Sequence, residues 1–409
     1  MRLLHRRDDP DGGGAAGCCD PARGLKSNLC RCTGYRAIED ALHGGCHEGE
    51  RARAGRALVR GREPFTLDHT LPGLLHLVLP RSPHAHARVR SIDSSAVGSG
   101  VLVLTHVDVP SILYSTGRHT NRLEGPGDTR MLDDVVRFRG QRVAAVVASS
   151  MAEAQAAARA IVVDYEVLPA VFDVDAALEP GTPLVHGDKG RGRVADRRSV
   201  ERPLRFDGRR RRGRRRRLRR SHRDRRGDVL HPARAARVPR DAATTWVDER
   251  GRVNVRTSTQ VPFLVREELE RLLGVEVRVF TARVGGGFGG KQELLVEDVV
   301  ALAALRTGRP VRVELTREEQ FAATTTRHAM RVQVRAGARA DGVLTALELS
   351  LLSDTGAYGN HGPGVMFHAL GESLGVYRCP NKRRSGRVAY THTVPAGAVR
   401  GYGSPRQAR

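Results

Sequence analysis

The clearest pattern of hydrophobic and polar positions lies between residues 142 and 169. Arg142-Val-Ala-Ala-Val-Val-Ala148 is a short apolar run of β-formers, which predicts a buried strand. Ser150-Met-Ala-Glu153 has the spacing of a capping box, and the alanine-rich residues after it predict a helix to about Ala160. Ile161-Val-Val-Asp-Tyr-Glu-Val167 predicts a second strand, which Pro169 ends. Strand, helix and strand in so short a stretch predict a compact α/β unit.

A second group of elements begins near Ala242. Residues 244–257 predict two strands joined by a turn at Gly251, and residues 294–306 predict a helix with one apolar face, ended by Gly308. The remaining expected elements are strands, at residues 275–280, 311–315 and 344–352. Helices and strands follow one another without an internal repeat. The expected fold class is α+β.

Composition narrows the class of protein. A chain of 409 residues is long enough for two or three domains, and 4% aromatic residues with one tryptophan leave valine, leucine and alanine to build the core. No apolar stretch is long enough to span a bilayer, and the N-terminus has no apolar segment of signal-peptide length, which favours a cytoplasmic protein. Six cysteines are too few for a disulfide scaffold and favour metal or redox use.

The net charge of +24 comes mostly from one segment. Residues 191–240 hold 22 arginines and five acidic residues, a balance of +17, so self-repulsion predicts that residues 186–240 are disordered. One origin is an insertion that binds nucleic acid. The other is out-of-frame translation of a GC-rich gene, in which arginine, glycine, alanine and proline codons dominate. Because only Phe206 offers an aromatic stacking surface there, the second origin is favoured.

Candidate chemistry begins with the glycine-rich segment Arg283-Val-Gly-Gly-Gly-Phe-Gly-Gly-Lys-Gln292. It lies between a predicted strand and a helix expected to start near Gln292, where backbone N–H groups can approach an anion. A tight turn without a ligand is the alternative. The segment lacks the order of a Walker loop, and no acidic residue follows at the spacing of a dinucleotide fingerprint.

Two further motifs carry polar or metal-binding groups. Cys30-Arg-Cys32 holds two thiols at a spacing suited to a metal ion or an iron–sulfur cluster, although two buried thiols are an equal alternative. Near the other end, Pro395-Ala-Gly-Ala-Val-Arg400-Gly-Tyr402-Gly-Ser-Pro405 is a second glycine-rich loop, which carries one arginine and one tyrosine.

Together these motifs resemble the molybdenum hydroxylases of the xanthine dehydrogenase and aldehyde oxidoreductase family, in which they occur in the same order. The resemblance implies a partial helical [2Fe–2S] domain over residues 1–50 and an α/β hammerhead domain over residues 66–185. It also implies the first, incomplete part of an α/β molybdopterin-binding domain over residues 241–409. Residues 186–240 are the aberrant part, where the resemblance fails.

The resemblance assigns roles residue by residue. Cys30 and Cys32 match two of the four ligands of the family's [2Fe–2S] cluster. The expected cofactor-binding residues, beside the molybdenum and its pterin, are Gly287, Phe288, Gly289, Arg400 and Gly401, with the main chain of Arg400 facing the metal.

Three positions bear on the substrate. Tyr402 matches an aromatic residue that flanks the substrate channel. Gln292 stands where xanthine-oxidising members have a glutamate that contacts the purine, and His368 stands where they have an arginine. With both purine contacts different, we expect an aldehyde or another N-heterocycle as the small-molecule substrate.

The activity implied is a molybdenum-dependent hydroxylation, with water as the oxygen source and electrons passing to the [2Fe–2S] cluster. Molybdopterin is expected in its cytosine dinucleotide form, with a flavin or iron–sulfur partner subunit and a homodimeric assembly. Membrane binding is not expected, and nucleic-acid binding is the least favoured function.

Four departures from the family pattern support an alternative, an inactive, frameshifted and truncated fragment. No Cys-x-x-Cys pair precedes Cys30, and Cys18-Cys19 is a poor substitute. The family's glutamine near the molybdenum falls at Ala233 by ungapped count. An extra residue follows Ser404-Pro. The catalytic base is expected beyond Arg409, so no residue of this chain is named as catalytic.

Overall fold

The computed structural model describes residues 57, 60–117, 126–189 and 241–403, together with the backbone of three strands between residues 199 and 235. The chain divides into two compact units, residues 1–63 and 64–409, and every element below belongs to the second. The region expected to bind iron and sulfur, with Cys30 and Cys32, lies outside the described residues. So does the arginine run at residues 209–220.

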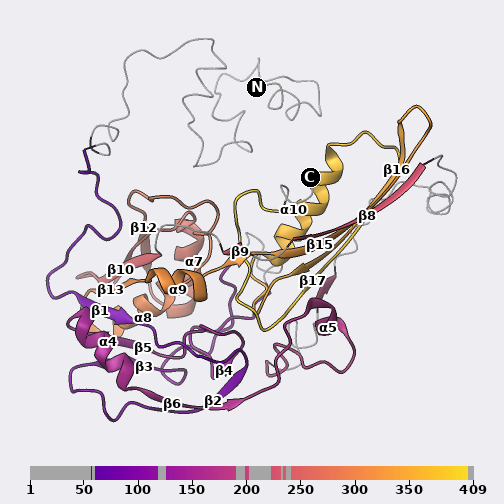
Figure 1. Cartoon of the computed structure of the whole chain (residues 1–409). Helices are drawn as coiled ribbons and strands as arrows, with labels where there is room; N and C mark the ends of the chain where they lie inside the picture. The colour runs from indigo at the N-terminus through magenta and orange to yellow at the C-terminus, as the bar shows by residue number, and fades with distance from the viewer. Residues whose placement is uncertain are drawn as a thin grey trace, which may run out of the picture. The chain divides into compact units, whose positions relative to one another are not determined.

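A seven-stranded sheet forms the first part of the second unit, in the order β12-β11-β10-β13-β1-β5-β3 (Figure 1). Its strands are β1 (Leu75–Val78), β3 (Leu102–Leu104), β5 (Ala145–Ala148), β10 (Ala242–Val247), β11 (Val253–Thr257), β12 (Val277–Phe280) and β13 (Val311–Glu314). β1 pairs parallel with β13, with Leu77 opposite Val313. Strands from the region before residue 186 and from the region after residue 240 therefore share one sheet.

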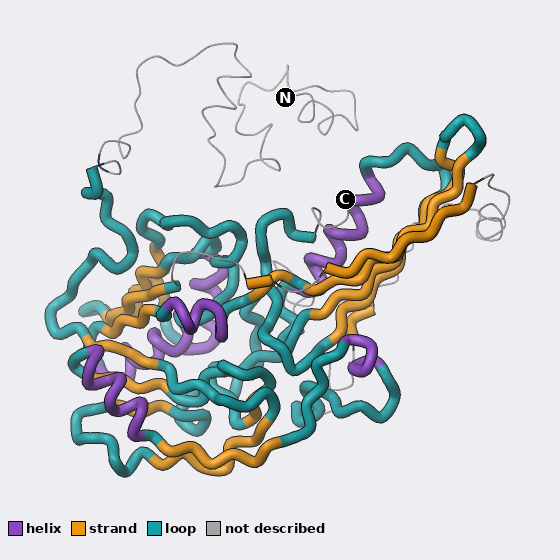
Figure 2. Tube along the Cα trace, viewed as in Figure 1, coloured by secondary structure: helices purple, strands orange, loops and turns teal. Residues whose placement is uncertain are grey.

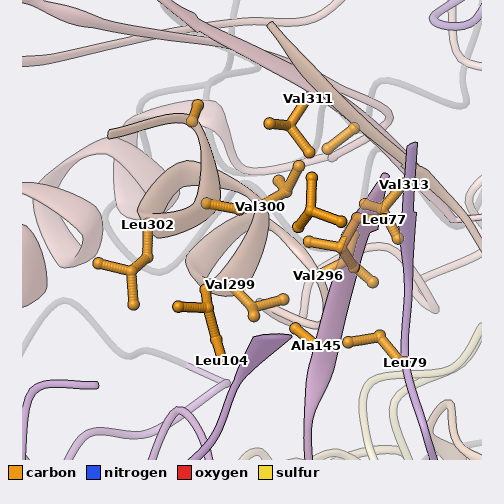
Figure 3. Packing of buried hydrophobic residues seen from close by; sticks show 14 of the residues in the cluster. Leu77, Leu79, Leu104, Ala145, Val296, Val299, Val300, Leu302, Val311 and Val313 are labelled. Atoms are coloured by element: carbon orange, nitrogen blue, oxygen red, sulfur yellow. The ribbon is translucent and has the colours of Figure 1, made fainter. Parts of the chain in front are cut away.

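Three helices pack on this sheet: α4 (Met151–Ala160), α7 (Pro262–Leu273) and α8 (Glu297–Thr307). Residues 299–304 of α8 are all buried, and the helix ends at Gly308, whose φ of 63° is the left-handed C-cap expected of glycine. Figure 3 shows the valines of α8 facing the aliphatic side chains of β1, β3 and β13. The core is built from valine, leucine, alanine and one methionine, as the composition predicted.

The hairpin predicted at residues 244–257 is confirmed. β10 and β11 pair antiparallel, and the turn between them contains Gly251 at a φ of 75°. The helix expected to start near Gln292 begins instead at Glu297. Its first turn is fixed by its own carboxylate, because Glu297 Oε2 accepts hydrogen bonds from the backbone N–H groups of Leu295 and Val296, each at 3.1 Å.

The compact α/β unit predicted around α4 is wrong, although its elements exist. β5 is buried at all four positions and lies inside the seven-stranded sheet, whereas β6 (Val162–Val167) is half exposed and pairs with β2 (Ala87–Asp93). With β4 (Val135–Val136) these two strands form a separate sheet. The capping box predicted at the start of α4 is only partly formed. Ser150 accepts from the Glu153 N–H, but the Glu153 carboxylate accepts from the N–H of Ser149.

A five-stranded sheet forms the second part, in the order β7-β17-β16-β15-β8. Figure 2 shows its long strands in orange beside a purple helix. Its strands are β7 (Ser199–Glu201), β8 (Arg223–His231), β15 (Ala329–Ala338), β16 (Leu344–Asp354) and β17 (Lys382–Ala389). Helix α10 (Gly362–Gly375) covers one face through Leu347, Leu349 and Leu351 of β16. The disorder expected across residues 186–240 does not extend to β8, which pairs along the length of β15.

The remaining elements are short. They are α5 (Val174–Leu178), α9 (Arg317–Ala322) and the paired strands β9 (Arg234–Ala235) and β14 (Thr326–Arg327). The mixture of sheets and helices agrees with the expected α+β class. Among the helices of the described residues, none has the length and apolar character needed to cross a membrane.

Candidate functional site

The glycine-rich loop at residues 283–291 leaves β12 and turns sharply at Phe288. Phe288 has a φ of 49°, a conformation that costs energy for any residue with a Cβ, and its side chain is 47% exposed. Gly286 and Gly289 on either side have φ values of 125° and 88°, so three of four consecutive residues have a positive φ. The strained backbone turns the aromatic ring of Phe288 outward.

Gln260 holds this loop in place. Its Oε1 accepts from the backbone N–H of Gly289 at 3.0 Å and of Lys291 at 3.4 Å. A Cβ on Gly287 would lie 2.4 Å from that oxygen, so a larger residue there would force the Gln260 side chain to move. The sequence interpretation missed Gln260. The family's glutamine near the molybdenum was expected at Ala233, which lies outside the described residues. The available signal was the polar Ser258-Thr-Gln260 directly after β11.

The second glycine-rich loop, residues 396–403, packs against the first. The backbone N–H of Arg400 donates to the carbonyl of Phe288 at 2.7 Å, and a Cβ on Gly289 would lie 3.1 Å from the carbonyl oxygen of Ala398. The structure thus brings together Gly287, Phe288, Gly289, Arg400, Gly401 and Tyr402, which the sequence motifs predicted to form one site. The carbonyl of Arg400 accepts from the Arg327 guanidinium at 3.0 Å, so both main-chain groups of Arg400 already hold protein contacts.

Tyr402 ends the second loop in a conformation like that of Phe288, with a φ of 41°. Its hydroxyl lies 2.8 Å from Nδ1 of His361, at the start of α10. Burial lowers the pKa of His361 to about 4, so the ring is neutral near pH 7 and the tyrosine hydroxyl donates to it. Burial, with the nearby Glu293 charge, raises the pKa of Tyr402. The hydrogen bond therefore joins two uncharged groups and fixes the Tyr402 ring.

Glu293 is the buried carboxylate behind both loops. Thr116 Oγ1 donates to its Oε2 at 3.1 Å, the backbone N–H of Ala398 donates to its Oε1 at 3.4 Å, and Nε2 of His361 lies 3.7 Å from Oε1. A Cβ on Gly397 would lie 2.4 Å from the same oxygen. Glu293 therefore joins the segment after the first loop to the backbone of the second. No sequence pattern singled it out.

The two positions that bear on the substrate lie on different elements. Gln292 is half-buried, its backbone N–H donates to the carbonyl of Gly289 at 3.3 Å, and its backbone also bonds to His361. His368 is exposed on α10, and its ring centroid lies 5.1 Å from that of Tyr402 in an edge-to-face arrangement. Nδ1 of His368 lies 2.9 Å from Glu372 Oε1. Tyr402 and His368 form one aromatic surface next to the loops.

Two groups that could have helped the first loop to bind an anion, the N-terminus of α8 and Lys291, are already engaged within the protein. The Glu297 carboxylate occupies the N-terminus of α8, and Lys291 is turned inward, only 3% exposed. Burial lowers the pKa of Lys291 against the attraction of Asp241 and Glu297. Burial raises the pKa of Asp241 to about 7, although Lys291 opposes that shift. Lys291 is thus engaged with carboxylates, and the loop offers a ligand its backbone and the ring of Phe288.

No metal-ligand cluster of three His, Cys, Asp or Glu side chains occurs in the described part of the chain. The glycines at positions 287 and 289 allow close approach to the backbone, and the Phe288 ring is exposed beside them. These residues fit a cofactor that is held through main-chain contacts.

Comparison with known families agrees with this geometry. A model described as "Molybdopterin cofactor-binding domain" matches residues 239–408. A second model, "Aldehyde oxidase and xanthine dehydrogenase, a/b hammerhead domain", matches residues 60–169. Both candidate loops lie within the first match, and β1 to β6 lie within the second.

Individual relatives and solved structures extend the match. The chain is 33% identical to "Probable hypoxanthine oxidase XdhD" of Escherichia coli (strain K12), over 85% of this chain and 40% of that protein. It is 30% identical to the "Nicotinate dehydrogenase large molybdopterin subunit" of Eubacterium barkeri, over 85% of this chain and 79% of that protein.

Among solved structures, quinoline 2-oxidoreductase from Pseudomonas putida 86 aligns with a TM-score of 0.71 at 30% identity. The alignment covers 86% of this chain and 45% of that one. Aldehyde oxidoreductase from Desulfovibrio gigas aligns with a TM-score of 0.74 at 26% identity, over 94% and 46%. The chain spans less than half the length of most of these relatives. It carries a molybdopterin cofactor-binding domain and belongs to the molybdenum hydroxylase family of xanthine dehydrogenases and aldehyde oxidoreductases.

Proposed function

We propose that the chain is the molybdopterin-binding part of a molybdenum-dependent hydroxylase that oxidises an N-heterocycle or an aldehyde. Water is the oxygen source, and a [2Fe–2S] cluster is the first electron acceptor. The observation that carries the proposal is the hydrogen bond from Arg400 N–H to the Phe288 carbonyl. It joins two glycine-rich loops, each of which presents an aromatic residue from a left-handed backbone conformation.

The residues of this chain have a positioning role in that reaction. Gly287 and Gly289 allow the pterin to approach the backbone, and Gln260 keeps the Gly289 N–H oriented. Molybdopterin, when bound, supplies the two-electron oxidation that no side chain can perform. The hydrogen bond from Tyr402 to His361 keeps the aromatic surface beside the loops in one orientation, which favours a flat substrate.

The substrate class follows from two positions that differ from the purine-oxidising members. Gln292 and His368 stand where the purine-oxidising members of the family have a glutamate and an arginine, so the ionic contacts to a purine are absent at these two positions. The ring of Tyr402 beside His368 offers stacking instead. The names nicotinate dehydrogenase and quinoline 2-oxidoreductase among the relatives favour an N-heterocycle over an aldehyde.

Further parts of the proposal come from the family pattern. Cys30 and Cys32 would provide two cluster ligands, and the molybdopterin would be the cytosine dinucleotide form. A flavin or iron–sulfur subunit and a homodimeric assembly complete the proposed enzyme in the cytoplasm. The competing proposal is an inactive fragment that holds neither molybdenum nor iron.

Metal and pterin analysis of the purified full chain separates the two proposals. Produced in a host supplied with molybdate, the chain should retain molybdenum together with a pterin detectable by its fluorescence after oxidation. Gly289→Ala should remove both, because its Cβ would press on Ala398 from a φ of 88°. Gly308→Ala is the matched control, since Gly308 also has a positive φ, 63°, but its Cβ would meet nothing within 4 Å. A wild-type chain free of molybdenum and pterin would support the inactive fragment.

A further inference from the structure

A cavity with several polar lining groups lies in the second unit, beside the start of the second glycine-rich loop at Pro395. It encloses about 80 Å³ between the segment around residues 129–142 and the segments at residues 323–325 and 358–360. We name it the Asn360 cavity. Its polar lining includes Thr116, Arg130, Thr325 and Asn360, of which Asn360 is the most buried. The volume exceeds that of one water molecule and suits a few waters or one small solute.

Three polar groups that line the Asn360 cavity lack hydrogen-bond partners within the described structure. They are Nδ2 of Asn360, Oγ1 of Thr325 and Nε of Arg130. Asn360 is 1% exposed and Thr325 is 5% exposed, so bulk water does not reach them freely. Oδ1 of Asn360 already accepts from the backbone N–H of His361 at 2.6 Å, which leaves the amide N–H groups as the unused part. Buried polar groups are rarely left without partners, so these groups are available to water or to a small solute in the cavity.

Three arginines line the cavity, Arg81, Arg130 and Arg142, and Asp133 is the acidic residue among the lining side chains. Arg130 Nη1 lies 3.9 Å from Asp133 and 3.6 Å from Asp134, so its charge has acidic neighbours. Asp133 is also paired with the Arg137 guanidinium at 2.6 Å and with Lys189 at 3.3 Å. The Asn360 amide and Arg130 Nε are therefore hydrogen-bond donors that Asp133 does not satisfy.

The other two arginines hold the walls of the cavity in place. Arg142 donates to Asp298 and to the carbonyl of Met131, and Arg81 donates to Glu319 and to the carbonyl of Gly140. Because both guanidinium groups have fixed partners, the cavity is formed before any ligand enters. A preformed site loses little entropy on binding.

We propose that the Asn360 cavity binds a small oxyanion, of the size of formate or of an inorganic tetrahedral anion. An oxyanion accepts several hydrogen bonds at once and would satisfy the Asn360 amide, the Thr325 hydroxyl and Arg130 Nε together. Hydrogen bonds to a charged acceptor are also stronger than hydrogen bonds to neutral water. Anion binding in this cavity does not depend on the proposed function.

Occupation of the cavity would reach the glycine-rich loops through two contacts. Thr116 lines the cavity and donates to Glu293, and the Thr325 side chain borders Gly397, where a Cβ would come within 2.7 Å of Thr325 Oγ1. The anion would therefore stiffen the segment that ends at Tyr402. An anion that supports these loops makes this a second, structural site behind the cofactor loops.

Isothermal titration of the full chain tests the proposal, with sodium formate and sodium phosphate as probes and sodium chloride at equal ionic strength as the reference. We expect saturable binding of at least one oxyanion, formate for a carboxylate site and phosphate for a tetrahedral one. Asn360→Leu and Thr325→Val should each weaken it about tenfold or more, because each removes a donor to a charged ligand. Thr245→Val is the matched control, since Thr245 Oγ1 is equally buried and unpartnered but does not line the cavity.

Two results would overturn the proposal. One is a wild-type titration in which neither oxyanion differs from chloride, which would leave the cavity to water. The other is binding that Thr325→Val and Thr245→Val weaken equally, which would place the anion elsewhere. If Asn360→Leu fails to fold, NMR of ¹³C-formate can be used instead. The formate line should be broader with the wild-type chain than with Thr325→Val if formate binds in the cavity.

Discussion

Removal of the Asp298 carboxylate should destabilise the protein strongly. Asp298 is fully buried in the first turn of α8 and accepts from two side chains. Nη1 of Arg142 donates at 3.0 Å and the hydroxyl of Tyr114 at 2.5 Å, and Nη2 of Arg142 makes a further contact. Burial opposes the charge on Arg142, but Asp298 more than offsets it and raises the pKa of the guanidinium.

The magnitude follows from what Asp298→Ala leaves behind. Arg142 would remain as a buried cation without its counter-charge, and breaking a buried pair in this way costs about 3–5 kcal/mol. Tyr114 would lose its acceptor, for about 1–3 kcal/mol more. The free energy of unfolding of an ordinary domain is about 5–15 kcal/mol, so Asp298→Ala should remove a large share of it.

Urea unfolding followed by circular dichroism measures the loss. The matched control is Asp341→Ala, which removes the carboxylate of the exposed Arg339–Asp341 pair and should leave the unfolding midpoint unchanged. The double variant Arg142→Met/Asp298→Leu removes both charges and should recover much of the lost stability. A loss below about 1 kcal/mol for Asp298→Ala would refute the reasoning, because the cation would then be solvated.

Three further predictions concern the site and its surroundings. Tyr402→Phe leaves Nδ1 of His361 without a donor and should lower the free energy of unfolding by about 1–2 kcal/mol; an unchanged urea midpoint would contradict the hydrogen bond. Gly397→Ala places a Cβ against Glu293 and should cost about 1–3 kcal/mol in the same assay, whereas an exposed glycine would tolerate the change. Because the folded protein holds a proton on Asp241 up to about pH 7, against the usual aspartate pKa of 3.8, this group destabilises the fold increasingly as pH rises through that window. Asp241→Asn should therefore gain stability relative to wild type between about pH 4 and pH 7, and a pH-independent difference would exclude the raised pKa.

Local sequence patterns predicted individual elements well. Alternation and turn residues indicated the β10–β11 hairpin with its turn at Gly251, and the apolar face and Gly308 indicated most of α8. These features depend on neighbours within a few residues, which periodicity and capping residues report directly. The start of α8 was misplaced because a side chain, Glu297, and not a backbone preference, sets it.

Long-range pairing could not be predicted in the same way. Nothing in the apolar run of β5 distinguishes a partner in β6 from a partner in β1, since the choice depends on which faces become buried. Gln260 and Glu293 were missed for a related reason. Each acts through contacts with residues 27 or more positions away, at Gly287 for Gln260 and at Gly397 for Glu293. The site residues found from the sequence came from motif resemblance, and their roles toward a cofactor remain predictions.

The parallel pairing of β1 with β13 has a consequence for how the chain assembles. A cut within residues 202–222 would leave β1, β3 and β5 on one fragment and β10 to β13 on the other. Neither fragment would hold the complete seven-stranded sheet, and each would expose a strand edge that the other normally covers. The join would become a bimolecular association, so the stability of the nicked protein would rise with fragment concentration. The contact of β1 with β13 in the seven-stranded sheet is thus comparable to an interface between two chains.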